Sequence, residues 1–187
     1  KHSPRTAQVD RIQSISRELA QVMMDNPTLQ VVLGHGSGSF GHYSGKKHRT
    51  REGVSTHDQW RGFSEVWHDA ATLNHLVMSE LQTVSLPVIA FPPSSSVFST
   101  NREITSWDLS PIENALEKNL LPVIYGDVVF DTQIGGTILS TEDLFLHMAS
   151  ILKPYKILLA GLDRGVWEDY PDKTNLIKII TPDSYPA

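Results

Sequence analysis

Hydrophobic residues recur every three or four positions in two long stretches of the chain, which predicts two amphipathic helices. The first stretch runs from Val9 to Met23. It is flanked by Ser3-Pro4 and Asn26-Pro27, which are typical of helix ends. The second stretch runs from Trp60 to Leu81. Two shorter helices are expected at 112–120 and 142–152.

Short apolar runs between these helices predict β-strands. We expect strands at 29–33, 88–91, 122–125, 157–160 and 176–180. Two further runs around Gly135-Gly136 predict a β-hairpin over 128–139. Residues 43–58 are polar and basic without a period, so no regular element is expected there. Strands that alternate with helices indicate an α/β fold with a mostly parallel sheet.

The composition is that of a globular domain and narrows the classes of partner. The 187 residues are 40% hydrophobic and 20% charged, which is enough to bury a core. A net charge of −5 without a basic stripe argues against nucleic acid and anionic membrane surfaces as partners. The sequence has no cysteine and no apolar run of about 20 residues, and no signal peptide is expected. We therefore expect no disulfide, no thiolate metal site, no membrane partner and a cytoplasmic location.

The most informative segment is HGSGSFGH at 35–42, which follows an apolar run. Glycines let a backbone approach a ligand closely, and several N–H groups can turn toward one anion, so phosphate is the expected ligand. His42 would donate a charge-assisted hydrogen bond to that phosphate. The alternative for His42 is a solvent-exposed loop histidine. His35 is expected to be structural.

The same segment also matches G-x-G-x-x-G, a motif of two other protein classes. A dinucleotide-binding fold needs a helix that opens at Gly41 and an acidic residue after a second strand. The residues that follow are polar and basic and lack an apolar face. A protein kinase needs V-A-I-K, H-R-D and D-F-G, which the sequence does not contain. A tight turn without a ligand is the remaining alternative.

Other segments carry candidate polar groups. Gly126 permits close approach, and Asp127 can accept hydrogen bonds from loop N–H groups or organise lysines or Mg²⁺, with ordinary turn chemistry as the alternative. Ser140 opens a helix whose N-terminus either faces phosphate groups or is merely capped. The loop at 160–171 can hold a base and ribose. The basic run at 46–51 either attracts a polyanion or is a solvated loop.

Three segments together resemble the isopentenyl phosphate kinase family, within the amino acid kinase superfamily. They are HGSGSFGH at 35–42, PVIYGDVVFD with TILSTEDL at 122–144, and ILLAGLDRGVWEDYP at 157–171. Lys1 also resembles the lysine that ends the family's first motif, K-L-G-G-S-x-x-x-D-K. Ser37 departs from the family, which has a glycine there in H-G-G-G. The resemblance covers nearly the whole chain.

The resemblance implies an α/β fold, namely a three-layer αβα sandwich with a mostly parallel open sheet and a β-hairpin insertion. It implies one domain over 1–187, mainly the N-terminal acceptor-binding lobe, with the nucleotide-binding lobe starting at about 155–187. The family's opening strand and its later V-T-G-G-M-x-x-K segment would then lie outside these residues. The resemblance also implies a homodimer.

The implied activity is ATP-dependent phosphorylation of isopentenyl phosphate to isopentenyl diphosphate, with Mg²⁺, in an alternative mevalonate route. His42 and Lys1 would be catalytic, and no protein metal site is expected. The other implied acceptor-site residues are Gly38, Ser39, Gly41, Gly126, Asp127 and Ser140. Those implied at the nucleotide are Asp163, Gly165, Val166, Tyr170 and Pro171. The isoprenoid tail would rest against Phe63, Val66 and Trp67, which are also good core residues.

A phosphate acceptor is already mostly a dianion at neutral pH, so its attack needs no general base. The difficulty is repulsion, which costs about 1 kcal/mol per charge pair at ~4 Å in water. Positioning and neutralisation by N–H groups, His42, Lys1 and Mg²⁺ would overcome it. The alternatives are another superfamily phosphotransferase with a phosphonate, carbamate or acyl acceptor, a non-catalytic small-molecule-binding domain, and a dinucleotide oxidoreductase.

Overall fold

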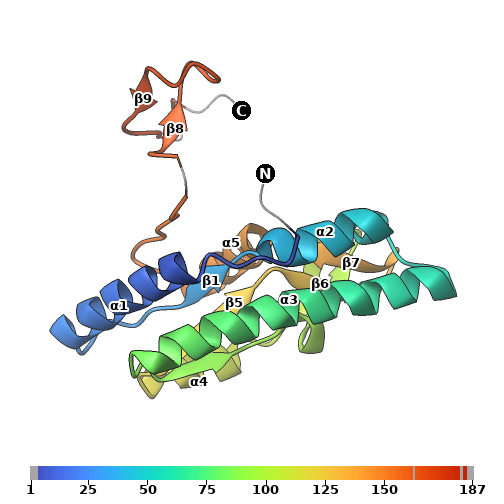
Figure 1. The fold of residues 1–187 in the computed structure, drawn as a ribbon, viewed down its shortest axis with the longest axis horizontal. Helices are drawn as coiled ribbons and strands as arrows, with labels where there is room; N and C mark the ends of the chain where they lie inside the picture. The colour runs from blue at the N-terminus through green and yellow to red at the C-terminus, as the bar shows by residue number, and fades with distance from the viewer. Residues whose placement is uncertain (1–3, 162, 182, 185–187) are drawn as a thin grey trace. The chain divides into compact units, whose positions relative to one another are not determined.

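The structure, a computed structural model, describes residues 4–161, 163–181 and 183–184 (Figure 1). The chain divides into two units, Lys1–Lys153 and Pro154–Ala187. The helices of the first unit are α1 (Val9–Asp25), α2 (Gly38–His48), η1 (Thr50–Glu52), α3 (His57–Thr83), η2 (Pro93–Ser95), α4 (Ser110–Glu117) and α5 (Thr141–Leu152). Its strands are β1 (Leu33–His35), β2 (Val88–Ala90), β3 (Val97–Thr100), β4 (Glu103–Trp107), β5 (Leu121–Tyr125), β6 (Asp127–Asp131) and β7 (Gly135–Leu139). The second unit contains the hairpin β8 (Val166–Trp167) and β9 (Leu176–Ile177).

A parallel sheet with the strand order β1-β5-β2 forms the centre of the first unit. All five residues of β5 are buried, because successive side chains point to opposite faces of the sheet and helices cover both faces. Leu121 and Val123 pack with residues of α1 and α3, whereas Ile124 packs with residues of α4 and α5. In Figure 1, α1 and α3 lie in front of this sheet and α5 lies behind it. The predicted α/β sandwich is therefore confirmed.

A second, mixed sheet has the strand order β4-β3-β6-β7. Its β6–β7 hairpin, with Asp127 opposite Leu139, confirms the predicted hairpin. The β3–β4 hairpin was not predicted, because most side chains of β4 are exposed or only partly buried and its sequence has no clear alternation. Strand β3 pairs with β6 in parallel, and this pairing joins the two hairpins.

The carboxylate of Asp131 organises the turns of both hairpins. It accepts hydrogen bonds from the hydroxyl of Ser99 and from the backbone N–H groups of Asn101, Arg102, Gln133 and Ile134. Burial alone would raise the pKa of Asp131, but these donors outweigh burial and hold that pKa well below its usual range. The ionised carboxylate thus holds the turns of the two hairpins together at one end of the mixed sheet.

Helix α2 occupies residues for which a glycine-rich loop and an irregular basic stretch were expected. That expectation was wrong because the buried face of α2 is made mostly of Gly41, Ser44 and Gly45, which give no hydrophobic period. These small residues allow close packing instead: a Cβ on Gly45 would lie 2.9 Å from Cδ1 of Ile138. On the facing helix, a Cβ on Gly62 would clash with the ring of His48.

Several element boundaries also differ from the predictions. The expected strand at 157–160 is irregular and largely exposed, since it has no strand partner in the part of the chain that the structure describes. Strand β1 lies at Leu33–His35 rather than at 29–33, and β9 covers only the start of 176–180. None of the helices among the described residues is long and apolar enough to span a membrane.

Candidate active site

Three of the segments predicted to carry the site meet at the carboxyl ends of β1 and β5. The carbonyl of His35, the last residue of β1, accepts hydrogen bonds from Gly126 N (3.2 Å) and Thr141 Oγ1 (2.7 Å). His35 is also paired with Tyr125 of β5, and their rings stack with centroids 5.6 Å apart. The end of β1, the Gly126 turn and the start of α5 are therefore fixed together. This edge is where parallel α/β sheets bind ligands.

The imidazole of His35 is part of this framework. Its Nδ1 lies 3.0 Å from the carbonyl of Gly36, and its Nε2 lies 3.1 Å from the side chain of Asn74 on α3. Burial lowers the pKa of His35, so the ring is neutral near pH 7. These contacts agree with the structural role expected for this histidine.

Gly34 lets α5 lie directly against β1. A Cβ at this position would lie 2.6 Å from Cε2 of Phe145 and 2.8 Å from Cγ2 of Thr141. Both residues belong to α5, whose first turn includes the Thr141 hydroxyl that bonds to His35. The close approach made possible by Gly34 thus sets the position of the α5 N-terminus at the sheet edge.

The first turn of α2 has backbone donors without a side-chain cap among the described residues. The N–H groups of Phe40 and Gly41 bond to the carbonyl of Ser37. The N-cap residue Ser37 makes no side-chain cap within the described part of the chain, so the first-turn N–H groups of Gly38 and Ser39 are left without one. Gly38 has φ +52°, which favours glycine. Such a helix start is a ready anion-binding arrangement, so the expected phosphate chemistry is kept although the segment is helical.

His42 lies one turn further along α2, where it is exposed. Its neighbour Gly41 is buried, with the side chain of Ser37 filling the place of a Cβ. The helix therefore presents the imidazole of His42 and the first-turn N–H groups as separate donors on one element. Its role as a phosphate ligand stays a prediction.

Asp127 is a buried carboxylate at the start of β6. It is 1% exposed and accepts hydrogen bonds from Val128 N (2.8 Å) and Ser94 N (3.3 Å). Burial raises the pKa of Asp127 to about 6, although both hydrogen bonds favour the ionised form. The bond to Ser94 holds the short helix η2 against β6. A role for Asp127 in organising lysines or Mg²⁺ stays a prediction.

Ser140 caps α5 through a reciprocal pair of hydrogen bonds with Asp143. The Ser140 hydroxyl accepts from Asp143 N (3.1 Å) and donates to Asp143 Oδ2 (2.8 Å). The Asp143 carboxylate also lies 3.8 Å from a guanidinium nitrogen of Arg51. The capping expected as one alternative for Ser140 is thus confirmed, with Asp143 as its partner at the S-x-x-D spacing.

Residues 5–187 match the family model described as amino acid kinase family. The chain belongs to the amino acid kinase family. It is 31% identical to isopentenyl phosphate kinase from Methanocaldococcus jannaschii, over 96% of this chain and 73% of that protein. It is 30% identical to the isopentenyl phosphate kinase from Arabidopsis thaliana, over 75% of this chain and 43% of that protein.

Solved structures of amino acid kinase family members agree with this assignment. An X-ray structure of isopentenyl phosphate kinase superposes with a TM-score of 0.81 at 26% identity, over 89% of this chain and 68% of that one. The Thermoplasma acidophilum isopentenyl phosphate kinase product complex superposes with a TM-score of 0.79 at 25% identity, over 91% and 68%. The chain spans 43% to 73% of the length of the curated relatives that it matches, and less than two thirds of several of them.

The residues expected at the nucleotide of this amino acid kinase family member lie in the second unit. Asp163 forms an ion pair with Lys173. Gly165 immediately precedes Val166, the first residue of β8, and Tyr170 and Pro171 lie in the turn that follows this strand. Their role at a nucleotide stays a prediction.

Two other predictions concern Lys1 and the residues for the isoprenoid tail. Lys1 lies outside the described residues. Phe63 and Val66 are buried in a cluster with Val54 and Val128, so they serve the core of the family fold. Trp67 is 45% exposed. The tail contact of all three residues stays a prediction.

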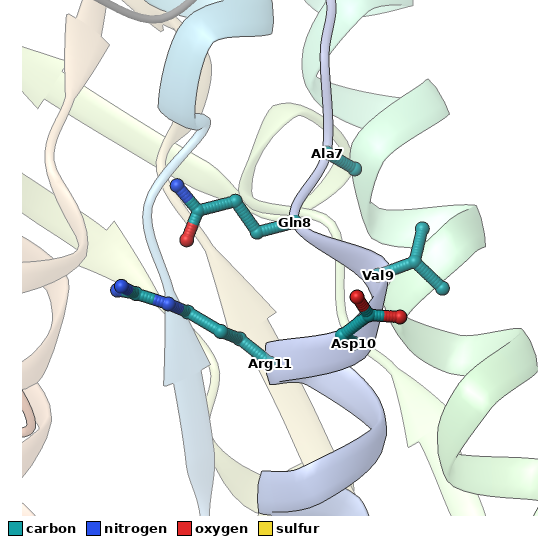
Figure 2. Close-up of a pocket in the computed structure, with 5 residues that line it drawn as sticks. All are labelled: Ala7, Gln8, Val9, Asp10 and Arg11. Carbon is teal, nitrogen blue, oxygen red and sulfur yellow. The ribbon is translucent and has the colours of Figure 1, made fainter.

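Two surface pockets lie apart from the acceptor-site residues predicted from the family. One, of about 570 Å³, is lined by Ala7–Arg11 at the start of α1. Figure 2 shows Gln8 and Arg11 extending to one side of this turn and Val9 to the other. The other pocket, of about 780 Å³, lies between η1, Trp60 and the β6–β7 turn. Within the described residues, no cluster of three histidine, aspartate or glutamate side chains is arranged to hold a metal ion.

Proposed function

We propose that this chain is the acceptor-binding part of a kinase that transfers a phosphoryl group from ATP to isopentenyl phosphate, giving isopentenyl diphosphate. The observation that carries the proposal is the 31% identity to an isopentenyl phosphate kinase over 96% of the chain. The uncapped first turn of α2, with His42 on the same helix, supports it because both offer donors to an acceptor phosphate.

The proposed mechanism is positioning with charge neutralisation. The acceptor phosphate is the nucleophile and needs no proton removed. The N–H groups of Gly38 and Ser39 and the ring of His42 would hold its oxygens, and Lys1 would add a positive charge between acceptor and ATP. Interactions of this kind stabilise a transferring phosphoryl group without covalent participation of the protein.

Mg²⁺ would enter with the nucleotide. Among the described residues, the candidate carboxylates are Asp127 and Asp143, which are separate and do not form a cluster. This agrees with the usual binding of magnesium by one or two carboxylates together with substrate phosphates. Bound there, the ion would neutralise negative charge on the phosphate chain.

We extend the proposal to a cytoplasmic homodimer. The half-exposed aromatic residues Phe98 and Phe130, with ring centroids 6.3 Å apart, support self-association because exposed apolar groups of this kind favour contact with another protein surface. Light scattering of the full-length protein would measure its mass, and a monomer at micromolar concentration would contradict the dimer.

The test of function is an acceptor panel assayed with ATP and the full-length enzyme. Isopentenyl phosphate should be phosphorylated in preference to a phosphonate, a carbamate or a carboxylate. Turnover of a carboxylate alone would favour the other phosphotransferases of the family. Absence of ATP binding in calorimetry would instead indicate a non-catalytic binding domain.

His42→Ala tests the role of the imidazole. We expect kcat/KM for isopentenyl phosphate to fall by about 10²–10³-fold, the range typical for a lost transition-state hydrogen-bond donor. His68→Ala, at an exposed position of α3, is the matched control and should keep its activity. Near wild-type turnover of His42→Ala would show that the role assigned to His42 is wrong.

A further inference from the structure

The segment that precedes α1 is bound to the first turn of α2 at three points. Thr6 N donates to the hydroxyl of Ser39 (3.1 Å), and this hydroxyl donates to the carbonyl of Thr6 (2.9 Å). Arg5 N donates to the carbonyl of Ser39 (3.3 Å). The Ser39 hydroxyl is thus occupied by the N-terminal segment, so the group that Ser39 offers to a phosphate is its N–H.

A two-point ion pair anchors the same segment to α3. Arg5 Nε donates to Asp69 Oδ1 (2.9 Å), and Arg5 Nη2 donates to Asp69 Oδ2 (3.1 Å). The Asp69 side chain is only 3% exposed, and a buried carboxylate without a partner is costly. Hydrogen bonding to Asp69 raises the pKa of Arg5.

Glu65, one turn before Asp69, extends this contact to the far end of α2. Its carboxylate accepts from Arg5 Nη2 (3.3 Å) and from Lys47 Nζ (2.9 Å), and it lies 2.6 Å from His48 Nε2. The hydrogen bonds from Lys47 and then His48 lower the pKa of Glu65 to about 2. Both ends of α2 are therefore tied to one face of α3, and Arg5 provides the tie near the first turn.

From this geometry we infer that Arg5 and Asp69 are positioning residues for the acceptor phosphate. The inference rests on the proposed function. The pair holds residues 5–6 against Ser39, and this contact fixes the direction of the N–H groups at the start of α2.

Enzyme kinetics can separate a positioning role of Arg5 from a role in stability. The Arg5 side chain is 49% exposed, but its loss leaves the buried Asp69 carboxylate unpaired, so Arg5→Ala should lower stability as well as release the segment beside the proposed phosphate. Misplacement of binding groups by about 1 Å can lower the rate about 100-fold. Loss of the pair should therefore lower the melting temperature and also raise KM for the acceptor, and only the rise in KM reports a positioning role.

Arg5→Ala in the full-length enzyme is the main test. We expect KM for isopentenyl phosphate to rise about 10-fold or more, while KM for ATP stays unchanged. Hydrogen exchange of the Thr6 amide should also become faster, and this readout does not depend on activity. A lower melting temperature with both KM values unchanged, or an equal rise in both, would overturn the inference.

Three further variants sharpen the test. Arg5→Lys should recover only part of the affinity, because an ammonium cannot reproduce the two-point contact. Arg5→Ala combined with Asp69→Asn should be no worse than the more impaired single variant, whereas additive losses would show that the two residues do not act as a unit. Arg17→Ala, which removes an exposed arginine of α1, is the matched control and should leave both KM values unchanged.

The two proposals fail in different ways. If the wild-type enzyme does not phosphorylate isopentenyl phosphate, the proposed function fails. Inorganic phosphate then serves as the binding probe in calorimetry. Weaker phosphate binding by Arg5→Ala than by Arg17→Ala supports the positioning role, and equal binding overturns it.

Discussion

Replacing Asp127 by Asn measures the cost of ionising a buried carboxylate beside the candidate active site. Burial raises the pKa of Asp127 from 3.8 to about 6. The folded protein therefore binds more protons than the unfolded chain between these two pH values. Stability consequently falls as pH rises through this window.

The two pKa values differ by about 2.2 pH units, which corresponds to about 3 kcal/mol of lost stability above pH 6. An asparagine avoids this cost, but its NH₂ group cannot accept the hydrogen bond from Ser94 N, which costs about 1 kcal/mol. Asp127→Asn should thus be about 2 kcal/mol more stable than the wild type at pH 8. At pH 4, where the wild-type carboxyl is protonated, the variant should be about 1 kcal/mol less stable.

Urea unfolding at a series of pH values from 4 to 8, followed by tryptophan fluorescence, measures this difference. Asp25→Asn, at the exposed end of α1, is the control for removing a carboxylate from the surface. A difference between Asp127→Asn and wild type that does not change with pH would refute the reasoning. A separate loss of kinase activity in the stabilised variant would support a role for the charge in the site.

Two further variants test the framework of the fold. Gly34→Ala should lower the free energy of unfolding by about 1–3 kcal/mol, because its Cβ would clash with Phe145 and Thr141. Gly36→Ala is the control and should be nearly neutral, since a Cβ at Gly36 meets no atom within 4 Å. Asp131→Asn should lower stability by about 2 kcal/mol at pH 7, because charge-assisted bonds to the two hairpin turns are lost. Because the pKa of Asp131 is depressed, this deficit should shrink as the pH falls toward and below the pKa that Asp131 has in the unfolded chain. A deficit that stays constant in denaturant unfolding down to pH 3 would contradict this account.

The helices α1 and α3 were predictable because each keeps an apolar stripe at helical spacing. The β6–β7 hairpin was predictable because two strand-forming runs flank a glycine-containing turn. Helix α2 was not predictable by this logic, since its buried face is mostly glycine and serine and its packing depends on backbone proximity rather than on apolar side chains.

The candidate site was predictable in composition but not in geometry. The sequence indicated His42 and the glycines around it, yet these residues form a helix rather than a loop. The Arg5–Asp69 pair joins residues 64 positions apart, so no local spacing could reveal it. The role of Asp131 could not be predicted either, because the N–H groups that donate to it come from two separate turns. Long-range polar contacts of this kind depend on the completed sheet.

The glycine-lined face of α2 has a thermodynamic consequence. Gly41 and Gly45 together cost about 2 kcal/mol of intrinsic helix propensity relative to alanine, so this helix depends on its neighbours to remain formed. An element of this kind opens locally at a lower free energy than the sheet behind it. Any anion bound at its first turn would recover part of that deficit, so ligand occupancy and the local order of α2 become one coupled equilibrium.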